Sequence, residues 1–309
     1  EVLKRNGFNT YGISDNLNIG EKQGFDQGFD RLRTFNYQGA PRVNTILKKW
    51  KNDIMNNGKY FLYLHYMDPH APYHQHEPLT IPLKGKKNIS ISAYDSEIRY
   101  VDHHIEEAFN MFDWDKNTLV IITSDHGEGL WDHGVMGHGY TLYREEIQVP
   151  LLMLLPVAKH HKEISTNVST IDILPTVREL VGLSDSKHDE GMSLVPLIYN
   201  EKKKPDERFI FSHLWNIVSE THKKIEFKAT IYRQIHFMIR SPLKRELYDL
   251  YNDKKERNNR FITNRKSART LESKFNLFMK KCKKYNPESI YYRLSDEKLE
   301  RLKSLGYIR

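Results

Sequence analysis

The sequence predicts an α/β protein: a mostly parallel sheet with helices on both faces, followed by a small antiparallel α+β subdomain. An uninterrupted apolar, largely β-branched run at 118–123 is typical of a strand buried on both faces of a sheet. Strand and helix patterns alternate before residue 200, which favours parallel strands connected by helices. After residue 200, apolar and polar residues alternate, as in half-exposed antiparallel strands. We therefore place the α/β core at 1–199 and the subdomain at 200–309.

The composition is that of a folded protein with a basic surface. The 309 residues are 39% hydrophobic and 12% aromatic, which excludes a disordered chain. A formal net charge of +8 favours anionic partners. The single cysteine, Cys282, excludes an internal disulfide, and no apolar run approaches the roughly 20 residues that span a bilayer. The chain opens with Glu1 and directly with a helical pattern, so we expect the fold to begin upstream.

Spacing and turn residues predict the elements of the first half. The glycines at 7 and 58 end helices, and two prolines fix the irregular loop. In order, we expect a helix at 1–6, a strand at 8–13, a turn-rich loop at 24–30, a helix at 42–55, a strand at 60–67 and an irregular loop at 68–73.

The second half contains the longest amphipathic helix, expected at 94–112. Its apolar face is formed by Ile98, Val101, Ile105, Ala108 and Phe112. Further expected elements are a strand at 149–155, a helix at 169–181 that starts with a capping box, a charged linker at 201–205, strands at 209–214, 225–230 and 235–240, a basic helix at 267–284 and a short tail helix.

Chemistry is concentrated directly after the central strand. Asp125 and His126 are adjacent, and Gly127 allows the backbone to bend so that both side chains turn toward one point. The carboxyl edge of such a sheet is where ligands bind, so the two residues are candidate metal ligands. The alternative is a solvated polar turn. Three histidines and several acids fall between Asp125 and Glu146, and a loop this polar is costly to order unless something binds it.

Seven segments of the chain match the sulfatases of the alkaline phosphatase superfamily. They are 61–73, 94–102, 123–128, 137–139, 171–176, 246–250 and 302–308, and they occur in family order along nearly the whole chain. The chain therefore resembles a sulfatase. The resemblance implies an alkaline phosphatase-like fold and metal-dependent hydrolysis of an anionic sulfate ester.

The resemblance also implies roles for four residues. Asp125 and His126 match two ligands of one divalent cation, which is Ca²⁺ in many sulfatases, while the imidazole also suits Mn²⁺, Zn²⁺ or iron. His138 occupies the place of a sulfate-binding lysine, and His70 that of the histidine that protonates the leaving alcohol. A sulfate monoester needs such a cation and acid together with a nucleophile. We expect His70 and His138 to converge on the same anion.

Three departures from the family pattern concern the nucleophile and its surroundings. The Cys-x-Pro-Ser-Arg motif, whose cysteine or serine becomes formylglycine, is absent, and neither 241–245 nor Cys282 replaces it. The paired aspartates that complete the metal site are also absent, and 11–16 takes the place of a Gly-Lys-Trp-His segment. We expect this chain to be the larger, carboxyl-terminal part of a sulfatase-like fold that does not turn over sulfate esters alone.

Two other functions are compatible with the same residues. Phosphonate or phosphodiester hydrolases and phosphoethanolamine transferases share the Asp-His pair, and a non-catalytic protein could use half a site to bind anions. A nucleic acid is not expected as a partner, because the basic residues form no recognition motif. The resemblance favours an extracytoplasmic location, whether periplasmic, secreted or lysosomal, and the oligomeric state is left open.

Overall fold

The structure is a computed structural model that describes residues 1–114, 116–156, 161–184, 186, 189–199, 208–218, 223–241 and 244–282. Contacts divide the chain into two compact units, Glu1–Ile122 with Leu152–Lys159, and Thr123–Leu151 with His160–Arg309. The units interleave along the chain, and the boundary expected between residues 199 and 200 stays a prediction. The predicted linker at 201–205 and the tail helix lie outside the described residues.

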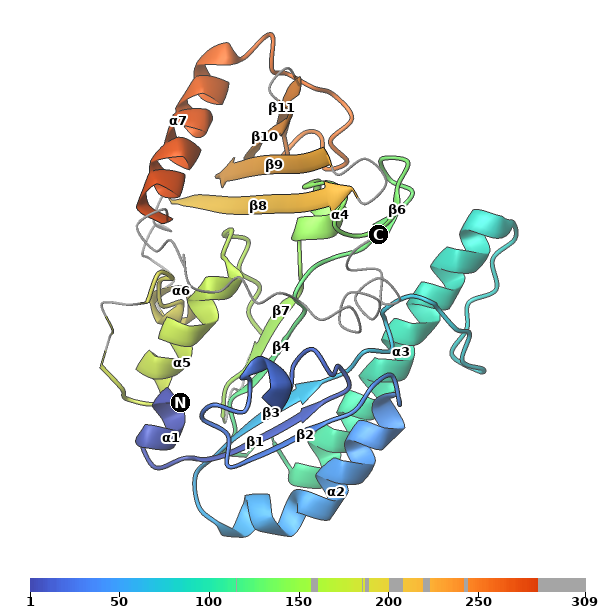
Figure 1. Cartoon of the computed structure of the whole chain (residues 1–309), viewed down its shortest axis with the longest axis vertical. Helices are drawn as coiled ribbons and strands as arrows, with labels where there is room; N and C mark the ends of the chain where they lie inside the picture. The colour runs from blue at the N-terminus through green and yellow to red at the C-terminus, as the bar shows by residue number, and fades with distance from the viewer. Residues whose placement is uncertain are drawn as a thin grey trace. The chain divides into compact units, whose positions relative to one another are not determined.

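The first unit contains the predicted parallel sheet. Helix α1 (Val2–Arg5) leads into β1 (Asn9–Ser14), which pairs in parallel with β2 (Arg31–Thr34) on one side and β3 (Tyr60–His65) on the other. The order is therefore β2-β1-β3, as Figure 1 shows. A short turn of 3-10 helix, η1 (Glu21–Gln23), lies in the loop between β1 and β2.

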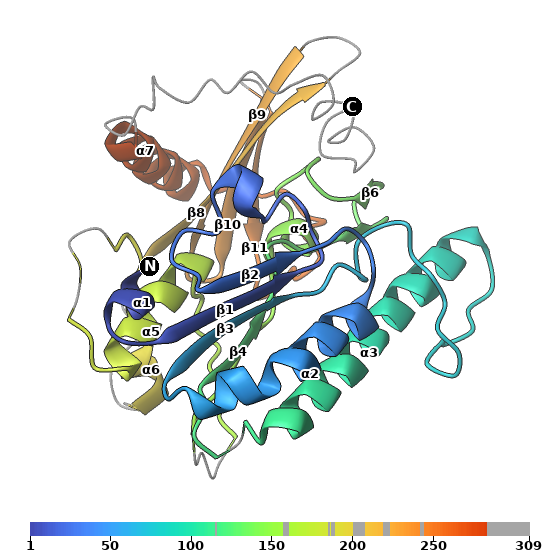
Figure 2. The same ribbon diagram turned by 60° about the horizontal axis from the view of Figure 1, so that its bottom comes forward.

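Two long helices, α2 (Ala40–Asn56) and α3 (Lys86–Phe112), lie side by side against this sheet (Figure 2). The apolar positions of α2 pack on the sheet as their spacing predicted. On α3 one assignment was wrong: the Ile98 side chain is exposed. Its neighbour Glu97 is buried instead, because its carboxylate accepts hydrogen bonds from the backbone N–H of His74 and from the His76 ring. A polar contact to the preceding loop thus replaces an apolar one.

The central strand differs from its prediction. Strand β4 (Val120–Thr123) pairs with β7 (Leu151–Leu154) in a separate two-stranded sheet. Its first three residues are half-buried and Thr123 is exposed, so burial on both faces was wrong. The reason is the short ladder, because in the described part of the chain β7 is the only hydrogen-bonded neighbour of β4.

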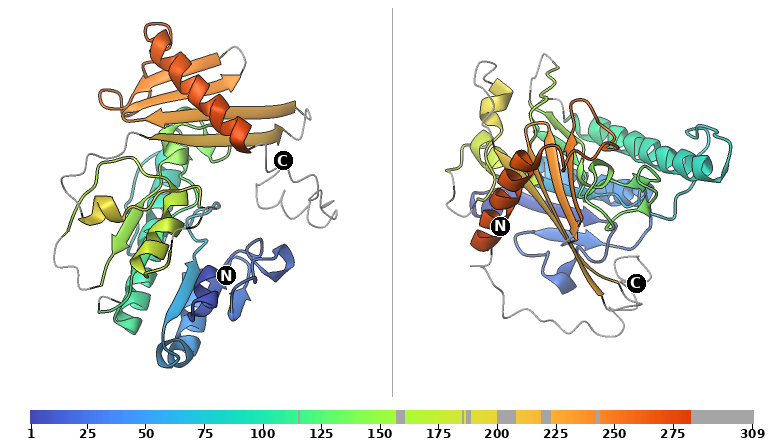
Figure 3. Two further views of the ribbon diagram at one scale, coloured as in Figure 1. Left: turned by 90° about the vertical axis from the view of Figure 1, so that its left-hand side faces the viewer. Right: turned by 90° about the horizontal axis from the view of Figure 1, so that it is seen from above.

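The second unit contains the antiparallel sheet predicted from the alternating segments. Its order is β11-β10-β9-β8, formed by β8 (Phe209–Val218), β9 (Lys223–Tyr232), β10 (Ile235–Ser241) and β11 (Lys244–Asp249). Helix α7 (Arg265–Cys282) crosses one face of this sheet (Figure 3). Strand β11 was not predicted, because Glu246, Leu247 and Tyr248 are all buried and leave no alternating pattern.

The predicted capping box begins η2 (Thr170–Asp172), which continues directly into α5 (Ile173–Leu180), and α6 (Val195–Tyr199) follows later in the chain. The Ser169 N–H donates to Asp172 at 2.7 Å, and the Arg208 guanidinium donates to both Asp172 oxygens. Burial alone would raise the pKa of Asp172, but Arg208 and the backbone N–H groups outweigh it and lower the pKa below its usual value. Among the described helices, none is both long and apolar enough to cross a bilayer.

Candidate functional site

The loop after β4 is organised by Glu146. This loop contains a small antiparallel hairpin of β5 (Gly129–Leu130) and β6 (Met136–Gly137), and it ends in the short helix α4 (Arg144–Ile147). The buried Glu146 carboxylate accepts hydrogen bonds from the N–H groups of Gly139 and Tyr140, at 2.7 and 3.1 Å. Its backbone carbonyl accepts from the N–H of Gly127 at 2.9 Å. One residue that the sequence analysis missed therefore holds both ends of the loop.

Gly127 is needed for a reason that differs from the predicted one. Its backbone does not adopt the positive φ that favours glycine. Instead, a Cβ at this position would lie 2.1 Å from the Glu145 carbonyl oxygen and 3.0 Å from its carbonyl carbon. The absence of a side chain lets α4 pack directly against the backbone beside His126.

Asp125 and His126 turn toward each other, as predicted. The His126 Nδ1 lies 2.8 Å from the Gly127 carbonyl oxygen, which can only accept, so Nδ1 carries the proton. The other nitrogen, Nε2, lies 3.7 Å from Asp125 Oδ1. A histidine that donates from one nitrogen to a carbonyl and presents the other as a lone pair has the usual form of a metal ligand. The Asp125 side chain is 75% exposed and accessible to a ligand.

His138 joins this pair from the far side of the loop. Its ring lies against the His126 ring with centroids 3.9 Å apart and planes 31° apart. Its Nδ1 lies 3.2 Å from the nearer oxygen of the buried Glu128 carboxylate. Burial disfavours the charged ring, but Glu128, with smaller contributions from Asp125 and Glu146, outweighs it and raises the pKa of His138. The Glu128 carboxylate thus stabilises the charged form of the ring relative to a histidine in solvent.

Asp125 and His126 together offer two ligands that suit a divalent cation, which is half of a four-ligand site. Asp125 offers a carboxylate oxygen and His126 an imidazole nitrogen, a combination that first-row divalent metals accept and Ca²⁺ accepts through the oxygen. In the described ranges, no three His, Cys, Asp or Glu side chains are grouped so that they could hold a metal ion. A cation here would take its remaining ligands from elsewhere.

His70 lies in the first unit, in the loop after β3. Its Nδ1 is 2.7 Å from the Ala71 carbonyl oxygen and 3.1 Å from the Tyr37 hydroxyl. Because the carbonyl can only accept, Nδ1 carries the proton, and the other ring nitrogen, Nε2, is a buried atom. The site residues thus fall in two units, three in one and His70 in the other. The convergence of His70 and His138 on one anion stays a prediction.

The position of Tyr37 beside His70 is fixed by a buried aspartate. Asp15, which is fully buried, accepts hydrogen bonds from the N–H groups of Gln38 and Gly39, both at 2.8 Å. Burial raises the pKa of Asp15, and these two hydrogen bonds oppose the rise without cancelling it. Tyr37 itself has a φ of 49°, a conformation that a bulky residue adopts only when its surroundings impose it. Asp15 lies in the segment that replaces Gly-Lys-Trp-His, and the sequence analysis gave it no role.

Two family models match the chain. The sulfatase family model matches residues 1–183, and the model for the C-terminal region of N-sulphoglucosamine sulphohydrolase matches residues 131–284. Since the first match covers more than half of the sequence, the chain belongs to the sulfatase family.

Individual relatives match part of the chain. A Delta 4,5-hexuronate-2-O-sulfatase of Bacteroides thetaiotaomicron is 31% identical over 157 residues, which are 47% of this chain and 30% of the relative. An endo-4-O-sulfatase of the same organism is 29% identical over 186 residues, 52% of this chain and 37% of the relative. Arylsulfatase K of Canis lupus familiaris is 30% identical over 160 residues, 49% and 29% of the two chains. The matched part thus spans about a third of the length of each curated relative.

Two solved structures show that the fold is shared over most of the chain. One, in complex with its substrate D-glucosamine-2-N,6-O-disulfate, has a TM-score of 0.73 at 18% identity and covers 94% of this chain and 83% of its own. A phosphonate monoester hydrolase of Agrobacterium radiobacter has a TM-score of 0.66 at 16% identity, with 96% and 82% covered. At such identities the likeness concerns the fold alone, and the alkaline phosphatase-like fold is confirmed.

Proposed function

We propose that this chain contributes the metal ligands, the anion-binding group and the leaving-group acid of a sulfate ester hydrolase. The observation that carries the proposal is the contact between the His126 and His138 rings, which places the imidazole that bonds to Glu128 against the imidazole that lies beside Asp125. A solvated polar turn would have no reason to bury Glu128 against His138.

Each residue has a distinct part in the proposal. Asp125 Oδ1 and His126 Nε2 hold one divalent cation, Ca²⁺ by family or Mn²⁺ or Zn²⁺ by ligand type. When bound, the cation neutralises charge on the sulfate oxygens. The His138 ring binds a further sulfate oxygen, and Glu128 keeps that ring charged. His70 enters the step doubly protonated and donates its Nε2 proton to the oxygen of the departing alcohol, which leaves the neutral ring with its Nδ1–H bonded to the Ala71 carbonyl.

The nucleophile is assigned to none of the 309 residues, because the Cys-x-Pro-Ser-Arg motif does not occur among them. Covalent attack on sulfur needs an activated nucleophile, and the remaining groups would supply only electrostatic stabilisation. We therefore expect this sequence, expressed alone, to bind metal and anion without turnover.

The substrate class in the proposal is a sulfated saccharide. Two relatives are named as a hexuronate 2-O-sulfatase and an endo-4-O-sulfatase, and the net charge of +8 would attract sulfated polyanions. An extracytoplasmic location is part of the same proposal. A phosphonate monoester is the second candidate, because the phosphonate monoester hydrolase has the same fold.

Metal binding tests the proposal directly. Calorimetric titration of the chain with Ca²⁺, Mn²⁺ and Zn²⁺ should detect one site, and Asp125→Ala should weaken it at least about tenfold, since half of the protein ligands are lost. Asp132→Ala, an exposed aspartate of the same loop, is the matched control and should bind like the parent chain. Equal metal affinity in Asp125→Ala and Asp132→Ala would remove the assignment. Added sulfate and methylphosphonate then compare the two ligand classes by their effect on the thermal midpoint.

A further inference from the structure

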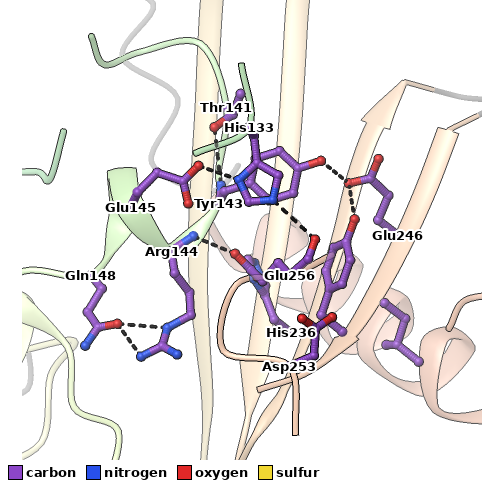
Figure 4. Close-up of polar contacts among 12 residues, drawn as sticks. His133, Thr141, Tyr143, Arg144, Glu145, Gln148, His236, Glu246, Asp253 and Glu256 are labelled. Carbon is purple, nitrogen blue, oxygen red and sulfur yellow. Dashed lines mark hydrogen bonds and ion pairs between the residues drawn. The ribbon is translucent and has the colours of Figure 1, made fainter. Parts of the chain in front are cut away.

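A second polar cluster in the same unit connects the C-terminal sheet to the loop of His126 and His138 (Figure 4). We call it the Glu256 cluster, and it consists of Glu256, His236, His133, Arg144 and Glu145. Its centre is inaccessible to solvent, because Glu256 is 2% and His236 0% exposed. None of these side chains belongs to the proposed metal and anion site.

Glu256 bonds to three partners from separate segments. One carboxylate oxygen accepts from His236 Nδ1 on β10, and the other accepts from the backbone N–H of Arg144 at 2.8 Å. Its backbone carbonyl lies 3.2 Å from His133 Nε2, whose ring bonds to Glu145 through Nδ1. Glu256 also has a φ of 53°, so its unfavourable backbone conformation is maintained by these contacts.

The contact to Arg144 reaches both site histidines through α4. Arg144 is the first residue of this short helix, and Glu146 is the third. Glu146 in turn bonds to Gly139, which follows His138, and to Gly127, which follows His126. Hydrogen bonds from β10 to Glu256 and from Glu256 to Arg144, the backbone of α4 from Arg144 to Glu146, and the hydrogen bonds of Glu146 therefore connect β10 to both flanks of the histidine pair.

We propose that Glu256 is a positioning residue for His126 and His138. By fixing the start of α4, it sets where Glu146 holds the two ends of the loop, and thereby the contact between the two rings. The inference rests on the proposed function for what the rings do, and on the contacts in the structure for where they lie. An apolar pair could fill the same volume without the cost of burying a carboxylate, but it could not define the position of α4 by a directional bond.

The decisive experiment removes the hydrogen bond between the Arg144 N–H and the Glu256 carboxylate. Arg144→Pro deletes this N–H and places the proline Cδ on the side of the Glu256 carboxylate, while proline is tolerated at the first position of a helix. Tyr143, with φ −69° and ψ 161°, already has the extended conformation that precedes proline. Arg144→Ala is the matched control, because it removes the same side chain, including its contact to Gln148, and keeps the N–H.

The readout is the imidazole NMR signals of His126 and His138 in the metal-free chain at constant pH. In Arg144→Pro both signals should lose the mutual shift that the rings impose on each other at 3.9 Å, and in Arg144→Ala both should stay in place. Glu256→Ala also removes the bond to His236, but both variants remove the bond between the Arg144 N–H and the Glu256 carboxylate, so Glu256→Ala should reproduce the change in the two histidine signals and the double variant should add nothing to it.

Unchanged histidine signals in folded Arg144→Pro, or a double variant whose shifts are the sum of the single ones, would overturn the proposal. If Glu256→Ala does not fold, the comparison of Arg144→Pro with Arg144→Ala decides alone, with the folding of each variant checked by circular dichroism. The proposed function is tested by a different result: it is wrong if the parent chain binds no metal, and the histidine signals do not bear on it.

Discussion

His70 and His138 are both held through Nδ1, but their partners differ in charge. His70 contacts the neutral Ala71 carbonyl and the Tyr37 hydroxyl, whereas His138 contacts the Glu128 carboxylate. Neutral acceptors keep one proton on Nδ1 and do not stabilise a second proton on Nε2, so a proton on Nε2 can be transferred. A carboxylate stabilises the doubly protonated ring and keeps it charged. One residue type can thus serve as a proton donor in one loop and as a fixed cation in another, because of a single neighbour.

The largest expected effects separate these two roles by substrate. In a protein that carries these residues together with a nucleophile, we expect His138→Ala to lower kcat/KM about 100-fold on both an alkyl and a nitrophenyl sulfate, because both present the same sulfate group. His70→Ala should lower activity by about 100-fold or more on the alkyl ester and far less on the nitrophenyl ester, whose leaving group needs little protonation. Equal losses for His70→Ala on the two esters would remove its assignment as the acid.

A change in the backbone beside His126 should destabilise the loop that contains His126 and His138, and not the loop of His70. Gly127→Ala places a methyl group 2.1 Å from the Glu145 carbonyl oxygen, so α4 must move, at a cost of about 3 kcal/mol in the free energy of unfolding. Gly134→Ala is the matched control in the same loop. It has open space and a φ of 79°, so it should cost only about 1 kcal/mol of backbone strain. Urea unfolding of both variants measures the difference, and equal midpoints would contradict the close-approach argument.

The smallest expected effect concerns the hydroxyl beside His70. Tyr37→Phe removes one of two acceptors of the Nδ1 proton, and Ala71 remains, so the free energy of unfolding should fall by less than about 1 kcal/mol. Tyr37→Ala also removes the ring that meets the His70 ring edge-on, and it should cost more. Should Tyr37→Phe prove as harmful as Tyr37→Ala, the hydroxyl rather than the ring would position His70.

Local patterns predicted the elements well because their causes are local. Helix α2, the capping box at Ser169 and the alternating strands β8 to β10 follow from spacing and from residue types at their ends. The pairing of Asp125 with His126 was also predictable, since both lie at the end of one strand. Strand β4 was placed correctly along the chain, but its burial depends on which strands lie beside it, and a single run of apolar residues does not contain that information.

The supporting carboxylates could not be predicted, because their partners are distant in sequence or are backbone groups. Asp15 bonds to N–H groups more than 20 residues away, and Glu256 bonds to an N–H that lies 112 residues earlier in the chain. Glu146 was visible only as one of two adjacent acids before a strand. A backbone N–H leaves no mark on the sequence, so an acid that binds one looks the same as a solvated acid.

The hydrogen bond between the Gly127 N–H and the Glu146 carbonyl joins the two ends of the loop after β4. Once the ends are joined, the free energy of closing such a loop rises only with the logarithm of its length, by about 0.6 kcal/mol for a doubling. Residues inserted at the hairpin tip, near Gly134, would therefore alter the loop's outer surface at little cost while Gly127 and Glu146 keep the histidine pair in place. The same closure makes this loop a segment that can change length without separating His126 from His138.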